Sequence, residues 1–216
     1  MSSYRHYTKI FDYLSTPQLP TSAEVTIAFG RKDPLVARAI GDLAIANLAE
    51  IIVITGGIGK DSGDILEQGF RSEAHYLDAL LEEDARSRHY GLPNIFLDEE
   101  ATNGGENARN SIAILHDHNT DTSSMTAVAH ATSAKRLAET LRHETFKIDG
   151  RPPNIHIKPT NYSFDPANPI DQKEACAELL RLADWPAKGW LGDQPDLPEN
   201  LVDFARDATN RSNPNQ

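Results

Sequence analysis

The sequence predicts an α/β protein with a doubly wound, mainly parallel sheet of about five strands and helices on both faces. Three observations support this class: short β-rich segments alternate with longer helical ones, one strand segment is apolar throughout, and polar or glycine-rich loops follow the strands. An alternation of strands and helices is typical of parallel strands joined by right-handed crossovers. A small helical C-terminal extension is expected to follow the sheet.

The predicted strands are short and rich in apolar and β-branched residues. The segment Ile51–Thr55 is apolar on both faces, which is expected of a central strand that helices cover above and below. The five strands are predicted at Glu24–Phe29, Ile51–Thr55, Asn94–Leu97, Thr126–Ala129 and Ile155–Lys158.

The helices carry start signals in the sequence. Pro34 follows Asp33, which is expected to cap the first helix of the sheet domain. Asn103 and Glu106 have the spacing of a capping box, and Thr132 is the expected N-cap of the next helix. The helices are predicted at Pro34–Ala49, Ser72–Arg88, Gly104–His116, Ser133–Arg142, Asp171–Asp184 and Leu201–Ala208.

The length of 216 residues indicates one domain with a small appendage. We expect an N-terminal helical arm over 1–22, a Rossmann-like domain over 23–158, an extension packed on it over 159–206, and a disordered tail over 207–216. The extension is expected to be too small for a core of its own.

Composition excludes several partners. The formal net charge is −11 and the sequence has no basic run, so neither a nucleic acid nor an anionic membrane surface is expected as a partner. There is no segment of about 18 apolar residues and no secretory signal pattern, which favours a cytoplasmic protein. The single cysteine, Cys176, is expected to be a buried structural thiol, and the histidines lack the spacing of metal ligands. The oligomeric state stays open.

Ligands of open parallel sheets bind at the carboxyl ends of the strands. The loop Gly56-Gly57-Ile58-Gly59-Lys60 follows the second strand, and its backbone N–H groups are suited to phosphate or carboxylate. An equally supported interpretation is a tight turn that only glycine can form. The loop matches neither the Walker A motif nor the dinucleotide-binding fingerprint.

The segment after the third strand also favours ligand contact. Gly104 and Gly105 lie in the first turn of a helix, where each costs about 1 kcal/mol relative to alanine. A ligand that approaches the backbone closely would explain this cost, and we therefore expect contact at Glu106 and Asn107. His130, directly after the fourth strand, has the position of a general base.

These loops together resemble the YdcF-like branch of the SanA/ElyC/YdcF family. The resemblance covers about residues 24–205 and is strongest in the segments IIVITGGIGK and ATNGGENARNS. Weaker matches are RSEAHYL, AVAHATSAKR, and the triplet Glu178, Arg181 and Leu182. Ser133 stands where the SanA-like branch carries histidine, so a catalytic role of that histidine is not transferred. SanA- and ElyC-like members are membrane-anchored, whereas no anchor is predicted here.

The resemblance implies a Rossmann-like sheet with a cleft and a nucleotide-like ligand, of which S-adenosylmethionine is one candidate. The first hypothesis is therefore binding of such a small molecule, with transferase activity as an option. A second is a metal-independent hydrolase or phosphoryl-type enzyme, with Arg31 and Arg136 on a sugar- or lipid-linked phosphate and Glu106 or His130 as base. A third is a regulatory module without catalysis. The expected ligand-binding residues are Gly30, Arg31, Gly56, Gly57, Ile58, Gly59, Lys60, Glu73, Thr102, Asn103, Glu106, Asn107, Thr132 and Arg136.

Overall fold

One parallel sheet of five strands organises the computed structural model, which describes residues 3–22, 24–59, 62–194 and 196–212. The strand order is β3-β2-β1-β4-β5, and every neighbouring pair is parallel. The strands are β1 (Glu24–Phe29), β2 (Ala49–Thr55), β3 (Asn94–Asp98), β4 (Ser124–Ala129) and β5 (Asn154–Pro159). The α/β, Rossmann-like fold class predicted from the sequence is confirmed.

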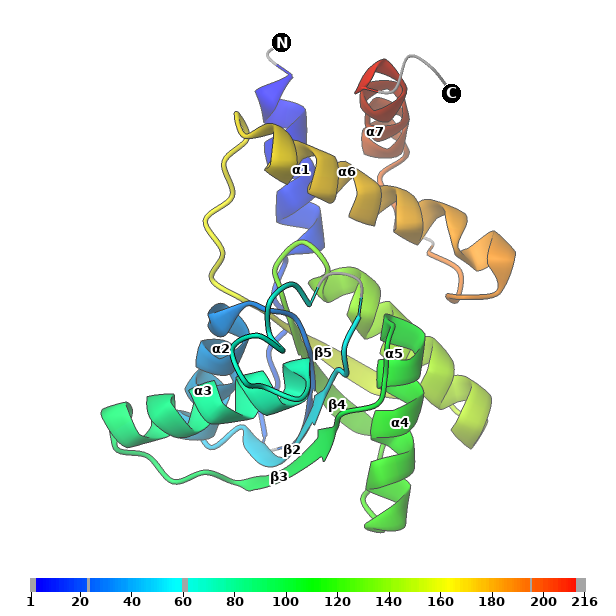
Figure 1. Ribbon diagram of the computed structural model, residues 1–216. Helices are drawn as coiled ribbons and strands as arrows, with labels where there is room; N and C mark the ends of the chain where they lie inside the picture. Colours follow the sequence, from blue (N-terminus) through cyan, green and yellow to red (C-terminus); the bar gives the residue numbers. More distant parts are fainter. Residues whose placement is uncertain (1–2, 23, 60–61, 195, 213–216) are drawn as a thin grey trace.

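Helices cover both faces of the sheet (Figure 1). Side chains of one strand alternate between the two layers: Ile27 and Phe29 pack toward α4 and α5, whereas Ala28 packs toward α2 and α3. This alternation produces two apolar cores, one on each side of the sheet. The helices are α2 (Pro34–Ile45), α3 (Glu73–Arg88), α4 (Gly104–Asp117) and α5 (Ala134–Asp149).

Helices α2 and α5 end at other residues than predicted. Helix α2 ends at Ile45 rather than at Ala49, because Asn47 adopts a left-handed conformation (φ 53°) and Ala49 already belongs to β2. Helix α5 extends to Asp149, where Gly150 ends it with φ 72°. Thr132 is not its N-cap; Ser133 takes that position without a side-chain hydrogen bond.

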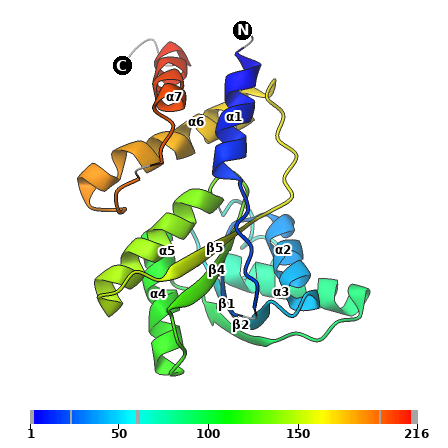
Figure 2. The same cartoon turned by 180° about the vertical axis from the view of Figure 1, so that it is seen from behind.

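A third layer lies beyond the carboxyl edge of the sheet (Figures 1 and 2). We call it the helical cap; its members are α1 (Tyr4–Leu14), α6 (Pro169–Asp184), the 3-10 turn η1 (Pro186–Lys188) and α7 (Glu199–Ser212). The extension shares a third apolar cluster with the N-terminal arm, in which Ile10 and Leu14 of α1 lie with Leu179 and Val202. Cys176 is buried in this cluster, as expected, and burial raises its pKa to about 11.

The disordered tail predicted over 207–216 is wrong for 207–212, which belong to α7. The partly apolar face of α7 explains the difference, since Ala205 and Ala208 pack in the cap core. Residues 213–216 lie outside the described residues. Within the described part of the chain, none of the helices has the length and apolar character needed to cross a membrane.

We predict that Leu179→Ala loosens the helical cap before the sheet. Leu179 is fully buried in the cap core, and truncating such a leucine costs about 2–5 kcal/mol. Hydrogen exchange followed by mass spectrometry should show faster exchange in α1 and α7 than in β1 and β4. Leu66→Ala is the matched control, because Leu66 is exposed. Equal acceleration in all elements would contradict a separate cap core.

Candidate functional site

A cleft of about 640 Å³ lies between the carboxyl edge of the sheet and one face of α6. It opens where β1 and β4 end, and between these two strands the order of the sheet reverses. Such a reversal point is where open α/β sheets bind ligands. Of the residues expected in the site, the cleft is lined by Gly30, Arg31, Gly59, Glu73, Thr102, Asn103, Asn107, His130 and Arg136.

Helix α6 forms the wall that the sequence analysis did not assign to the site. Its cleft residues recur every three or four positions, so they lie on one face of the helix, and Trp185 continues the wall beyond its end. The opposite face carries Cys176 and Leu179 into the cap core. The signal in the sequence was a polar stripe opposite an apolar one. The cleft face consists of Ile170, Lys173, Glu174, Ala177, Glu178 and Arg181.

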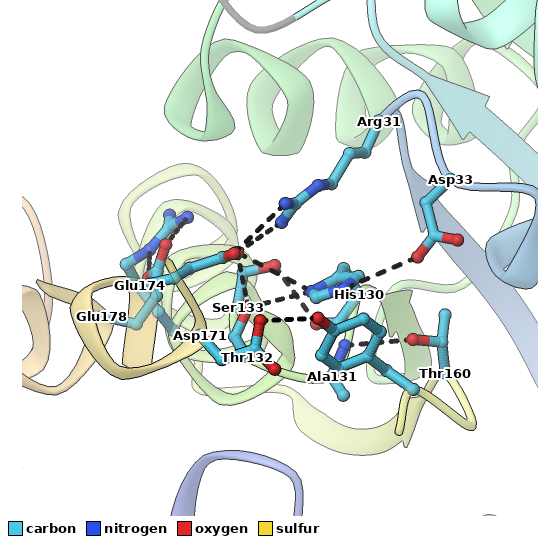
Figure 3. Close-up of polar contacts among 12 residues, drawn as sticks. Arg31, Asp33, His130, Ala131, Thr132, Ser133, Thr160, Asp171, Glu174 and Glu178 are labelled. Carbon is cyan, nitrogen blue, oxygen red and sulfur yellow. Dashed lines mark hydrogen bonds and ion pairs between the residues drawn. The ribbon is translucent and has the colours of Figure 1, made fainter. Parts of the chain in front are cut away.

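Arg31, directly after β1, is held by a carboxylate of α6 (Figure 3). Its two terminal nitrogens donate to the two carboxylate oxygens of Glu174, at 2.6 and 3.4 Å. The hydroxyl of Thr132 donates to the same carboxylate at 2.8 Å. Burial is the largest single effect on Glu174 and opposes its ionisation. The hydrogen bond and charge of Arg31, with the bond from Thr132, together outweigh burial and keep the pKa of this carboxyl below its ordinary value. Thr132 itself is buried behind the cleft wall.

Arg136 forms a second pair of the same kind. Its Nε and Nη2 atoms donate to the two carboxylate oxygens of Glu178, which also accepts from Arg181. The Glu178 side chain is only 5% exposed. The guanidinium carbon of Arg136 lies 5.2 Å from the ring centre of Trp185. Two arginines, one in the loop after β1 and one in the first turn of α5, thus line the cleft, each engaged by a carboxylate of α6.

His130 lies buried at the end of β4, between these groups and Asp33. Its Nδ1 is 2.9 Å from the hydroxyl of Thr132, which already donates its only proton to Glu174, so Nδ1 carries the proton of the neutral ring. The lone pair of Nε2 then faces Oδ2 of Asp33, 3.8 Å away. Burial, and after it the positive charge of Arg31, lower the pKa of His130. The ring is therefore neutral near pH 7, with Nε2 as its basic atom.

The glycine loop after β2 is better explained by packing than by free N–H groups. The N–H groups of Gly56 and Gly57 donate to the carbonyls of Asp98 and Ala101, at 2.9 and 2.6 Å. A Cβ on Gly57 would lie 2.6 Å from the carbonyl oxygen of Glu99, so no other residue fits there. Of the loop residues that the structure describes, Gly59 reaches the cleft, whereas Gly56, Gly57 and Ile58 do not. Lys60 lies outside the described residues.

The start of α4 forms the N-cap half of the predicted capping box, whereas Glu106 bonds to Thr102 rather than to the N–H of Asn103. Asn103 accepts the N–H of Glu106 at 3.0 Å, and the Glu106 carboxylate accepts the N–H and the hydroxyl of Thr102, at 2.8 and 2.7 Å. These bonds lower the pKa of Glu106, first of all the bond from the backbone of Thr102, which makes the carboxylate a weaker base. Glu106 is not among the described residues that line the cleft. The geometry supports a capping role for it.

Gly104 and Asn107 define the cleft end of α4. A Cβ on Gly104 would lie 2.8 Å from a terminal methyl group of Leu137, so Gly104 packs closely against α5. Asn107 is buried, and its Oδ1 has no hydrogen-bond partner among the described residues. Such buried acceptors are uncommon in folded proteins. Glu73, at the start of α3, accepts a hydrogen bond from Ser62 at 2.9 Å and lines the cleft beside Gly30.

We predict that the stability of the protein falls as the pH falls below about 6.5, because the folded state resists protonation of His130. The unfolded chain binds this proton more readily than the folded protein does. The loss of stability therefore begins at the ordinary pKa of histidine and grows as the pH is lowered further. Free energies of unfolding in urea from pH 7.5 to 5 should show a shallower slope for His130→Asn. His89→Asn is the control, since His89 is exposed at a left-handed position that asparagine tolerates. Equal slopes for His130→Asn and the wild type would contradict the prediction.

No protein-family model and no curated protein matches this chain. The resemblance carried by the sequence motifs therefore stays an expectation. The described residues also hold no group of three His, Cys, Asp or Glu side chains arranged for a metal ion. The function of the cleft has to be inferred from the residues that form it.

Proposed function

We propose that the cleft binds a nucleotide-like small molecule through its anionic end. The observation that carries this proposal is the convergence of Arg31 and Arg136 on one cleft at the reversal point of the sheet. A guanidinium presents two parallel donors that match the oxygens of a phosphate or carboxylate. The start of α4 lies at the same cleft, and the N-terminus of a helix attracts anions.

The remainder of the cleft suits the uncharged part of such a ligand. Phe29, Leu137 and Trp185 offer apolar surface on which a flat ring could pack. Asn107 offers an acceptor that a ligand N–H or O–H would satisfy. S-adenosylmethionine stays in the proposed class, because it combines a carboxylate with cationic groups that Glu73 would attract. The YdcF-like motifs of the sequence support the same ligand class.

We predict that a nucleotide or S-adenosylmethionine raises the melting temperature of the protein. A ligand at about 100 times its Kd adds about 2.7 kcal/mol of stability, which corresponds to about 5–10 °C for a chain of this length. AMP, ADP, ATP and S-adenosylmethionine form the panel, read by differential scanning fluorimetry. Arg31→Gln should reduce the shift, because the ligand loses one of its two guanidinium contacts.

The control for this experiment is Arg142→Gln. Arg142 pairs with Glu139 on α5 and is not among the described residues that line the cleft. It should keep the full shift. If no member of the panel shifts the melting temperature of the wild type, the proposal is wrong. If Arg31→Gln leaves the shift in melting temperature unchanged, the ligand binds at a site other than this cleft.

A second function, metal-independent hydrolysis of a phosphate ester, is favoured by the state of His130. Its neutral ring lines the cleft, and the carboxylate of Asp33 lies 3.8 Å from Nε2, where it would stabilise the protonated ring. In this proposal Arg31 and Arg136 hold the phosphate while Nε2 accepts a proton from the attacking water. The water oxygen bonds to phosphorus as the P–O bond to the alcohol breaks, and the protonated ring returns the proton to the leaving alkoxide.

If this second function holds, the hydrolysis rate should rise with pH through a pKa below about 6.5. His130→Asn should lower kcat by about 100-fold or more, the usual contribution of a general base. Release of inorganic phosphate from a generic phosphomonoester, measured with EDTA present, checks both effects. A rate that His130→Asn leaves unchanged would exclude His130 as the base.

A further inference from the structure

Both arginines of the cleft are already engaged by carboxylates of α6. Glu174 accepts from two nitrogens of Arg31, and Glu178 accepts from two nitrogens of Arg136. A carboxylate and a phosphate present the same pair of acceptors to a guanidinium. In this structure the two glutamates therefore occupy the positions that the anionic groups of a ligand would take.

We infer, resting on the proposed function, that the ligand carries two anionic groups, as a diphosphate does, which replace the carboxylates of Glu174 and Glu178 on Arg31 and Arg136. The two glutamates are four residues apart on α6, so their side chains start about 5–6 Å apart. Each guanidinium is bonded to one of these carboxylates, so the two anion positions lie along the same face of α6. A ligand with a single anionic group would engage one arginine and leave the other on its glutamate.

The surroundings of the two glutamates make the exchange feasible. Glu174 is 26% exposed, so its carboxylate can turn into solvent when the ligand takes Arg31. Glu178 is nearly buried, but Arg181 also donates to it and remains its partner when the ligand takes Arg136. The exchange therefore leaves neither carboxylate buried without a cation. A buried carboxylate without a cation would cost a large free energy of desolvation.

The helical cap can follow this exchange as a unit. Helix α6 packs its apolar face in the cap core with α1 and α7, and the two apolar cores of the sheet domain lie on the faces of the sheet instead. Figure 1 shows a long connection from β5 to α6 beside the cap. A small displacement of α6 away from the sheet, together with α1 and α7, would thus open the cleft and keep the packing inside all three apolar cores.

Glu174→Gln tests the exchange, because it keeps the shape of the side chain and removes the competing charge. Isothermal titration should give pyrophosphate a Kd about tenfold lower than that of phosphate in the wild type, and about tenfold lower again in Glu174→Gln. Glu139→Gln is the matched control: it breaks the Arg142–Glu139 pair on α5 with the same change of charge. It should leave the Kd within about twofold of the wild type. The pair ADP and AMP repeats the comparison with a nucleoside attached.

A second measurement uses the wild-type carboxylates. In Trp190→Phe the emission of the remaining tryptophan, Trp185, reports on Arg136 and Arg181, which lie against its ring. Saturating pyrophosphate should change this emission, whereas phosphate at the same occupancy should change it less. This readout stays valid should Glu174→Gln fail to fold.

The outcomes separate the two proposals. If nucleotides bind but Glu174→Gln binds pyrophosphate no tighter than the wild type, or phosphate binds as tightly as pyrophosphate, the two-anion inference is wrong and the proposed function stands. If neither nucleotides nor pyrophosphate bind any variant, both are wrong. If ADP binds more tightly than pyrophosphate, the ligand is a nucleoside diphosphate. If pyrophosphate binds more tightly, the ligand is a diphosphate that carries no nucleoside.

Discussion

The handedness of the crossovers is the constraint on which the site depends. Strands β2 and β3 extend the sheet on one side of β1, and β4 and β5 extend it on the other side. Right-handed connections then place α2 and α3 on one face of the sheet and α4 and α5 on the opposite face. The loops after β1 and β4 consequently leave the sheet toward opposite faces. The gap between them receives Arg31 from one loop and His130 from the other. The cleft follows from the winding of the chain rather than from any single motif.

The helical cap turns this open edge into an enclosed site with internal charge compensation. A bare carboxyl edge would expose two arginines and the start of a helix, all of them electropositive. The glutamates of α6 neutralise the arginines, and the network continues through Thr132 to His130. Partly buried ion pairs contribute little net stability, because desolvation offsets much of their attraction. Their main effect here is to fix the orientation of α6 over the sheet and to keep both arginines in the geometry that binds an anion.

Burial gives His130 its chemical state. Three carboxylates, those of Glu174, Asp33 and Asp171, and one guanidinium act on the ring. Desolvation and the guanidinium together outweigh the carboxylates, and the pKa falls. Glu106 shows the opposite situation, since exposed backbone and hydroxyl donors stabilise its charge. Two residues that the sequence presents as equivalent candidate bases are thus distinguished by their surroundings alone.

Local patterns in the sequence were sufficient for the fold class, for the presence of all five strands and for the caps at Asp33 and Asn103, because these depend on periodicity and on neighbours a few residues away. They also pointed to nine of the residues that line the cleft. The roles of Gly57 and Glu106, the core shared by α1 and α6, and the carboxylates on Arg31 and Arg136 required the tertiary structure. Contacts between residues 31 and 174, or between 136 and 178, join segments whose distance in the chain leaves no local trace, and only packing decides which of several charged side chains meet.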